Sequence, residues 1–329
     1  MFLLSCGVKK QKQLTSFEKD FCAMLNQKTI CNEVSCLGVG LHSGAPISMK
    51  ILPAKENTGI VFRRVDLNPA VEIKADFFNV KETKLATCLI VDEVRVSTIE
   101  HLMSALFALG LDNLVVEIDG PELPIMDGSA SPFIFVLQSA GIIEQNELKK
   151  LIFVKKDITF IGDNGEKCSF SPSENIKYNI STDFSHPHNC FSDVNQSLSF
   201  NLSLSAYQKE ISRARTFGFM SQYEELKKNN LARGGGMHNA IVFDNFKVLN
   251  ENGLRFDNEP VRHKLLDLMG DLYLAGSQII AEVTAHKPGH KVNNLALRKL
   301  MEHTSAWDYV EINNNSDLEL LNHGRIYSV

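Results

Sequence analysis

The chain has 329 residues, of which 44% are hydrophobic and 22% charged, a balance typical of globular proteins. Its net charge of −5 gives no argument for nucleic-acid binding. No apolar run approaches the about 20 residues that cross a bilayer, so we expect no transmembrane segment. The seven cysteines include no Cys-x-x-Cys pair, which indicates reduced thiols and a cytoplasmic protein.

The first half of the chain predicts short strands followed by helices. Residues 1–23 show no period and precede Met24, so we expect an N-terminal extension that is disordered or not translated. A helix is predicted from Ser97 to Gly110, and a second one is predicted from an N-cap at Ser131 to Ala140. Strands are predicted at residues 29–35, 47–51, 58–62, 71–96 and 113–118.

The second half repeats this order of elements. A polar stretch at residues 144–150 is a candidate domain boundary. Strands are predicted at residues 151–154, 158–161, 167–171, 178–182, 197–201 and 307–312, and helices at 221–228, 261–276 and 293–302. Because β-rich sequence precedes long helices in both halves, we predict an α+β fold with two domains, residues 24–148 and 149–329.

The segment that begins at His263 carries the most informative pattern. His263, Asp267 and Asp271 are spaced four residues apart, and this spacing places them on one stripe of a helix. Imidazole nitrogens and carboxylate oxygens are ordinary zinc ligands. A hydrogen-bonded pair on a solvated helix face has the same spacing, so the segment alone leaves both interpretations open.

Glu100 and His101 are the candidates for a catalytic base and a third ligand. Adjacent residues of a helix point about 100° apart, so one side chain is free to bind a metal while the other addresses a water. Ser97-x-x-Glu100 also fits a capping box, and His101 also fits a core position.

Other histidines compete for these roles. His186 and His188 have a chelating spacing but flank Pro187 in a polar segment. His290 follows Pro288-Gly289 and is predicted to lie in a loop, either as an acid near neutral pH or as a solvated turn residue.

Six segments, taken in order, resemble the zinc-dependent UDP-3-O-acyl-N-acetylglucosamine deacetylases of lipid A synthesis. The matching segments are residues 38–44, 97–102, 124–130, 212–219, 261–272 and 289–290. Each motif is weak by itself, whereas six in the family's order are specific. The resemblance extends from about Met24 to near the end of the chain.

The resemblance implies a fold and a reaction. The fold has two stacked domains, each a small β-sheet packed with two helices, with the helices facing inward and the active site at the domain interface. An insert near residues 215–243 of the second domain would form an acyl passage. The reaction is hydrolysis of the N-acetyl group of UDP-3-O-acyl-N-acetylglucosamine to the free amine and acetate. It is the committed step of lipid A biosynthesis in Gram-negative bacteria.

The resemblance also implies residue roles. Zn²⁺ is expected on His101, His263 and Asp267, a ligand set that Fe²⁺ also fits in the cell. The expected catalytic residues are the base Glu100, the acid His290, its partner Asp271 and the oxyanion donor Thr216. The expected substrate contacts are Lys264, Phe217, Leu41, Leu85 and, as a uridine-stacking ring, Phe184.

We expect a monomer. The alternative from another class is a catalytically silent nucleotide-sugar or lipid-binding protein that keeps the fold. A pure binding protein needs neither a base nor an acid, so the complete set of Glu100, His290 and three ligands favours the enzyme.

Overall fold

Two five-stranded sheets form the outer layers of the molecule. The computed structural model describes residues 26–183 and 195–311. The first sheet has the order β2-β3-β9-β4-β5 and the second the order β12-β13-β19-β14-β15. The strands of the first sheet are β2 (Val34–Val39), β3 (Pro46–Pro53), β4 (Ile60–Arg64), β5 (Val71–Lys74) and β9 (Leu114–Ile118). Those of the second are β12 (Ile158–Ile161), β13 (Lys167–Ser171), β14 (Lys177–Asp183), β15 (Asn195–Asn201) and β19 (Glu282–His286).

The two sheets share one topology. In each, the central strand comes last along the chain and pairs antiparallel with one neighbour and parallel with the other: β9 with β3 and β4, and β19 with β13 and β14. The two halves therefore repeat the same arrangement of strands, although their sequences show no evident repeat.

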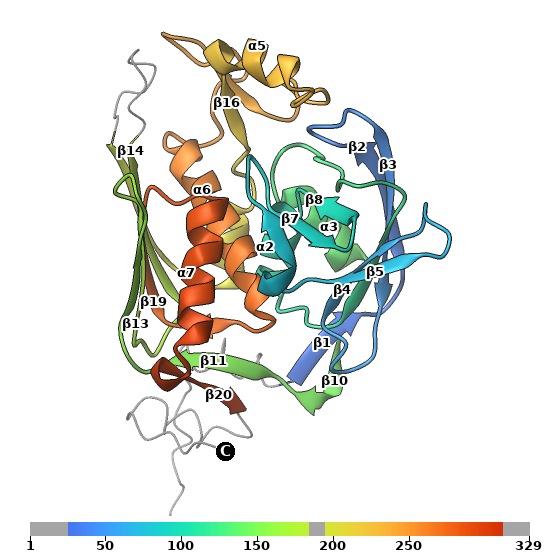
Figure 1. The fold of residues 1–329 in the computed structure, drawn as a ribbon, viewed down its shortest axis with the longest axis vertical. Coiled ribbons are helices and arrows are strands. Elements are labelled where there is room, and N and C mark those ends of the chain that lie inside the picture. Colours follow the sequence, from blue (N-terminus) through green and yellow to red (C-terminus); the bar gives the residue numbers. More distant parts are fainter. Residues whose placement is uncertain (1–25, 184–194, 312–329) are drawn as a thin grey trace, which may run out of the picture.

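Four helices lie between the sheets. Figure 1 shows them in the centre of the molecule, with the first sheet on one side and the second on the other. They are α2 (Glu100–Leu109), α3 (Ser131–Ser139), α6 (Glu259–Leu272) and α7 (His290–Glu302). This arrangement confirms the predicted α+β fold with helices facing inward.

A strand at the base of the molecule occupies most of the polar stretch at residues 144–150, where no strand was predicted. This stretch forms most of β10 (Ile142–Leu148), which pairs antiparallel with β1 (Asn26–Ile30), and it runs on into β11 (Lys150–Val154). The backbone pairs while most β10 side chains stay in solvent, so the apolar alternation that marks a strand is missing. β11 lies between β18 (Ile279–Ile280) and β20 (Trp307–Glu311).

Smaller elements complete the fold. A three-stranded sheet contains β6 (Val80–Glu82), β7 (Cys88–Val91) and β8 (Val94–Ser97). A projection at the top of Figure 1 contains β16 (Phe217–Phe219), α5 (Met220–Lys228) and β17 (Ile241–Phe243), in which β16 and β17 are parallel. The short helical segments are Phe77–Asn79, α4 (Leu204–Ala206), Tyr207–Ile211, Tyr273–Ala275 and Thr304–Ala306. In the part of the chain that the structure describes, no helix has the length and apolar character needed to cross a membrane.

The predicted starts of all five helices differ from the observed ones by one to three residues, and three of them show why. α2 begins at Glu100 rather than at Ser97, because the chain stays in β8 through Ser97. α3 begins at Ser131, with Ala130 rather than Ser131 as its N-cap. α7 begins at His290, because Gly289 is extended and serves as the N-cap. The helix break signalled by Pro288-Gly289 therefore lies before His290, and the loop prediction for this residue was wrong.

The crossing of α2 and α6 joins the two halves of the molecule. At Gly270 of α6, a Cβ atom would lie 2.1 Å from the Glu100 carbonyl oxygen and 3.0 Å from the Ser104 nitrogen of α2. Only a residue without a side chain permits this approach. The two helix backbones therefore pack in contact, and side chains near the crossing are forced together.

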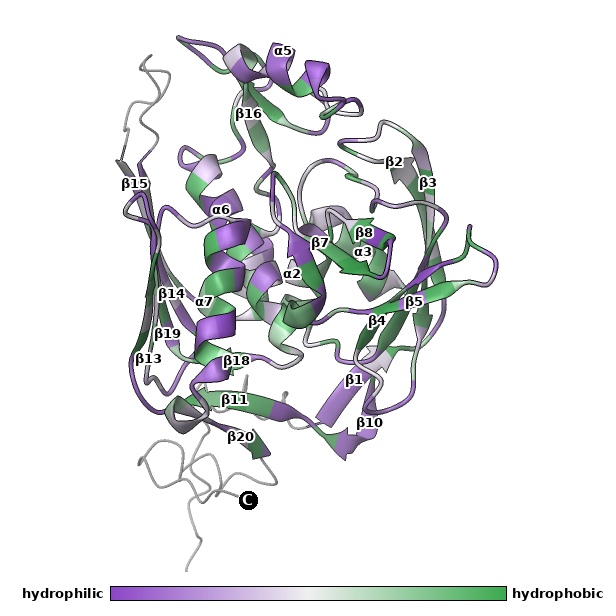
Figure 2. Ribbon diagram, viewed as in Figure 1, coloured by the Kyte–Doolittle hydropathy of each residue, from purple (hydrophilic) through white to green (hydrophobic). Residues whose placement is uncertain are grey.

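Both crossing helices are almost fully buried, polar residues included. Figure 2 shows hydrophilic segments on α2 and α6 at the centre of the molecule. Glu100, His101, His263, Asp267 and Asp271 are each at most 4% exposed. Burial of polar groups is costly unless they are paired or bind an ion, so this polar centre within an apolar core calls for a functional explanation.

Candidate active site

Three buried side chains converge where α2 crosses α6. His101 on α2 and His263 and Asp267 on α6 each offer one ligand atom, and these atoms lie within 4.8 Å of one another. The Asp267 Oδ1 atom is 3.4 Å from His263 Nε2 and 3.6 Å from His101 Nε2. The structure thus brings together the three residues that the sequence singled out as metal ligands, although about 160 positions separate the two helices.

Both histidines are held in the form that binds metals. Burial lowers the pKa of His101 and of His263 to about 3, so both imidazoles are neutral at ordinary pH. His263 Nδ1 lies 3.0 Å from the carbonyl oxygen of Ala214. Because a carbonyl oxygen only accepts, Nδ1 donates the hydrogen, and the lone pair of Nε2 faces Asp267.

The cluster fits a divalent cation. Asp267 Oδ1 is buried and has no hydrogen-bond partner among the described residues, although two imidazole nitrogens face it. Neutral imidazole lone pairs and a carboxylate oxygen are all acceptors, so none of them satisfies another. A cation bound by two histidines and one aspartate satisfies all three, and this donor set is one that Zn²⁺ accepts.

Glu100 lies beside the cluster, and its carboxylate lies between Thr87 and His290. Glu100 Oε2 accepts a hydrogen bond of 3.0 Å from the Thr87 backbone N–H, and Oε1 is 3.8 Å from His290 Nε2. Burial raises the pKa of Glu100 to about 7, against the opposing effect of His290. The capping-box alternative was wrong, because Ile99 is the N-cap of α2 and makes no side-chain capping bond.

His290 is held as a cation by carboxylates. His290 Nδ1 donates to Asp271 Oδ2 at 2.9 Å. Burial disfavours the charged imidazolium, but the carboxylates of Asp271 and Glu100 outweigh it and raise the pKa of His290 to about 10. The arrangement therefore pairs a proton acceptor that titrates near neutrality with a proton donor that stays charged.

Three supporting groups were missed by the sequence analysis. The Thr87 hydroxyl donates to Asp271 Oδ1, the Asn293 side-chain amide donates to Asp271 Oδ2 at 2.8 Å, and the Ala214 carbonyl accepts from His263. Asn293 lies one turn after His290 on α7, so its spacing from His290 could have identified it in the sequence. Thr87 belongs to a loop without a motif, and Ala214 contributes a backbone carbonyl whose direction no motif specifies, so only the tertiary structure identifies them.

Two adjoining cavities lie at the cluster. One of about 480 Å³ is lined by Glu100, the three clustered residues, His290 and Lys264. A second, of about 400 Å³, is lined mainly by apolar residues of the projection that contains β16, α5 and β17. The residues shared by both cavities include Leu41, Leu85, Thr216 and Phe217.

The structure describes some of the remaining candidate residues and not others. Lys264 Nζ is 3.8 Å from Asp267 Oδ2 and 5.6 Å from the centre of the Phe217 ring. His286, four residues before His290, lies on β19 with Nδ1 2.9 Å from the Ser181 hydroxyl and is not part of the cluster. Phe184, the alternative ligands His186 and His188, and residues 1–23 lie outside the described residues.

Together, these features define a class of protein. Hydrolytic metalloenzymes have this combination of groups: a buried cluster of two histidines and one aspartate, with a carboxylate and an imidazolium next to it in a cavity. Comparison with known proteins gives the particular family. A family model described as UDP-3-O-acyl N-acetylglycosamine deacetylase matches residues 27–302.

Relatives match over nearly their whole length. A protein of Cellvibrio japonicus named UDP-3-O-acyl-N-acetylglucosamine deacetylase is 52% identical over 287 residues, which are 87% of this chain and 94% of that protein. Proteins of the same name from Legionella pneumophila (strain Corby) and Alcanivorax borkumensis are 49% and 47% identical, over 87% and 89% of this chain and 93% and 96% of their own lengths. The chain belongs to the UDP-3-O-acyl-N-acetylglucosamine deacetylase family.

Proposed function

We propose that this protein removes the acetyl group of UDP-3-O-acyl-N-acetylglucosamine by means of a divalent metal held by His101, His263 and Asp267. Family membership supports the reaction, which is the committed step of lipid A biosynthesis. The single observation that carries the metal assignment is the convergence of three buried ligand atoms, one of which, Asp267 Oδ1, has no hydrogen-bond partner among the described residues. We propose Zn²⁺ as the metal, with Fe²⁺ as the alternative in the cell.

The proposed mechanism divides the work among four side chains. A bound divalent metal lowers the pKa of water and polarises the amide carbonyl. Glu100 takes the proton of the attacking water, and His290 gives its Nε2 proton to the departing glucosamine nitrogen. Asp271 keeps His290 charged and oriented, as the 2.9 Å hydrogen bond supports. Thr216, which lines the same cavity, donates a hydrogen bond to the carbonyl oxygen.

Substrate recognition is assigned to the two cavities. Lys264 contacts the polar part of the substrate at the edge of the metal cluster. The acyl chain follows Leu41, Leu85 and Phe217 into the apolar cavity formed by the insert near residues 215–243. Stacking of Phe184 on the uridine stays a prediction from the resemblance.

The proposal extends to organisation and location. The domains would be residues 24–148 and 149–329, each with one of the two matching sheets. The enzyme would act as a monomer in the cytoplasm.

The role of Glu100 is tested by substitution, whereas the alternative of a silent binding protein would require the wild-type protein to show no deacetylation at all. Glu100→Gln keeps the shape of the side chain and removes its charge, so we expect metal content to stay and kcat to fall about 10²–10⁴-fold. Metal analysis and steady-state deacetylation of the UDP-sugar measure the two quantities. The exposed variant Glu302→Gln, on the last turn of α7, serves as the control. An unchanged kcat in Glu100→Gln would remove Glu100 from the mechanism.

A further inference from the structure

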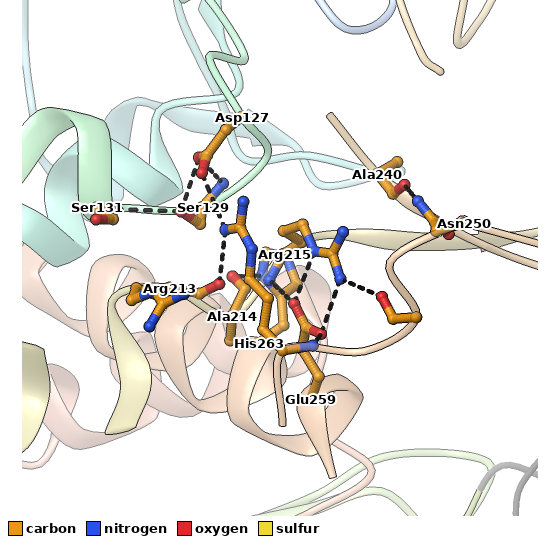
Figure 3. A network of polar contacts seen from close by, with 12 residues as sticks. Asp127, Ser129, Ser131, Arg213, Ala214, Arg215, Ala240, Asn250, Glu259 and His263 are labelled. Carbon is orange, nitrogen blue, oxygen red and sulfur yellow. Dashed lines mark hydrogen bonds and ion pairs between the residues drawn. The ribbon is translucent and has the colours of Figure 1, made fainter. Parts of the chain in front are cut away.

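A buried ion pair lies beside the cluster of His101, His263 and Asp267 and has no role in the mechanism described so far. Glu259 opens α6 and is 0% exposed, and Arg215 pairs with it through two side-chain hydrogen bonds, Nε to Oε1 at 2.9 Å and Nη2 to Oε2 at 3.1 Å. Glu259 Oε1 also accepts from the backbone N–H of Arg215 at 3.0 Å. Figure 3 shows the two side chains facing each other. Glu259 therefore fixes the backbone of Arg215 as well as its side chain.

One peptide group connects this ion pair with His263 of the cluster. The N–H of Arg215 and the C=O of Ala214 belong to the same planar unit, so fixing the direction of one fixes the other. The Ala214 carbonyl accepts from His263 Nδ1 at 3.0 Å. Figure 3 places Ala214 and His263 next to the ion pair. Glu259 thus holds one side of the peptide while the proposed metal ligand His263 is held on the other.

The geometry follows from the periodicity of α6. Glu259 and His263 are four residues apart and lie on the same face of the helix. The 214–215 peptide bridges them across one turn. Glu259 also lies in the first turn of α6, where the helix dipole favours a carboxylate.

A second arm connects this network with the first half of the molecule. The Arg255 backbone N–H donates to Glu259 Oε2 at 2.6 Å, and its guanidinium donates to Asp127 Oδ2 at 2.9 Å and to the Arg213 carbonyl at 3.0 Å. Asp127 precedes α3, in the half that supplies His101. The segment that carries Ala214 is therefore held from both halves.

We infer that Arg215 and Glu259 are positioning residues that set the metal affinity of the site by orienting His263 through the 214–215 peptide. The inference rests on the proposed function, because it takes His263 as a metal ligand. A role in stability alone is a weaker explanation for the presence of this ion pair, because a buried ion pair contributes little net stability relative to apolar residues of similar volume. Loss of a group that orients a metal-binding histidine typically lowers metal affinity about 10–100-fold.

The test measures zinc binding to the full chain. Glu259→Gln removes the charge, and we expect the Kd for Zn²⁺, measured against a chromogenic chelator, to rise about 10–100-fold. The control is Asp66→Asn, because Asp66 receives two side-chain hydrogen bonds from Arg64, a buried residue at the end of β4, although Asp66 itself is exposed. We expect this control to lower the thermal midpoint and leave the Kd unchanged. Circular dichroism verifies folding.

Two further variants keep the outcome decisive. If Glu259→Gln fails to fold, Arg215→Met/Glu259→Gln removes the unpaired buried cation as well, and the same rise in Kd is expected. A wild-type Kd in the folded Glu259 variant would overturn the inference alone. A wild-type Kd in His263→Ala would instead overturn the ligand assignment on which it rests.

Discussion

Substitution of Gly270 by alanine perturbs the helix crossing that assembles the site. The added Cβ would lie 2.1 Å from the Glu100 carbonyl oxygen, whereas an ordinary contact begins at 3.4 Å. The backbones must therefore separate by about 1.3 Å at this point, because the neighbouring atoms belong to the backbone of α2 and not to flexible side chains. Displacement by about 1 Å costs catalysis about 10²-fold.

The expected cost in stability has the same origin. Alanine in place of glycine normally stabilises a helix by about 1 kcal/mol. Overpacking at a buried contact costs about 1–3 kcal/mol, so we expect a net loss of stability at Gly270. Thermal unfolding measures this loss, and deacetylation kinetics with zinc titration measure the effect on the site.

A second glycine separates damage to the crossing from ordinary destabilisation. Gly276 lies just beyond α6 at a φ of +76°, with nothing within 4 Å of an added Cβ. Gly276→Ala should therefore lose about 1 kcal/mol through backbone strain and keep its kcat. A Gly270→Ala enzyme with wild-type kcat and zinc affinity would refute the argument that this contact sets the site.

Two further predictions concern the proton donor and the acyl passage. The Asp271 carboxylate does most to offset the lowering of the His290 pKa by burial. Asp271→Asn should therefore lower the pKa of His290 from about 10 and shift the alkaline limb of the kcat/KM profile to lower pH. An alkaline limb that stays in place would contradict the role of His290 as the acid. Ala240→Trp should fill part of the apolar cavity. Exclusion of about two methylene groups, at about 0.8 kcal/mol each, should raise KM about 10-fold for a long-chain substrate and leave KM unchanged for a short-chain one. An equal rise in KM for both substrates would contradict the assignment of this cavity to the acyl chain.

How far the sequence predicts this site depends on the range of each interaction. The stripe of His263, Asp267 and Asp271 was predictable because a spacing of four residues is a local property of a helix. The pairing of α6 with α2 is not local, and the approach depends on Gly270, whose role no periodic pattern reveals. The sequence offered Glu100 and His101 as candidates for the base and the third ligand, but only the resemblance favoured these roles over the capping-box and core alternatives.

The errors have the same explanation. β10 was missed because its residues are mostly exposed and it is held by backbone pairing with β1. His290 was assigned to a loop because proline and glycine mark a helix break without saying on which side the helix begins. Thr87 touches both Glu100 and Asp271, yet those contacts depend on how β7 packs against the helices.

Reconstitution of the metal-free enzyme tests the central claim most directly. Protein stripped with a chelator is titrated with Zn²⁺ under anaerobic conditions while bound metal and deacetylation are measured, in parallel with His263→Ala and the exposed control His303→Ala. The account predicts that activity rises with bound metal to one equivalent in the wild type and the control, and that His263→Ala neither retains the metal nor recovers. Full metal binding and full activity in His263→Ala would contradict it.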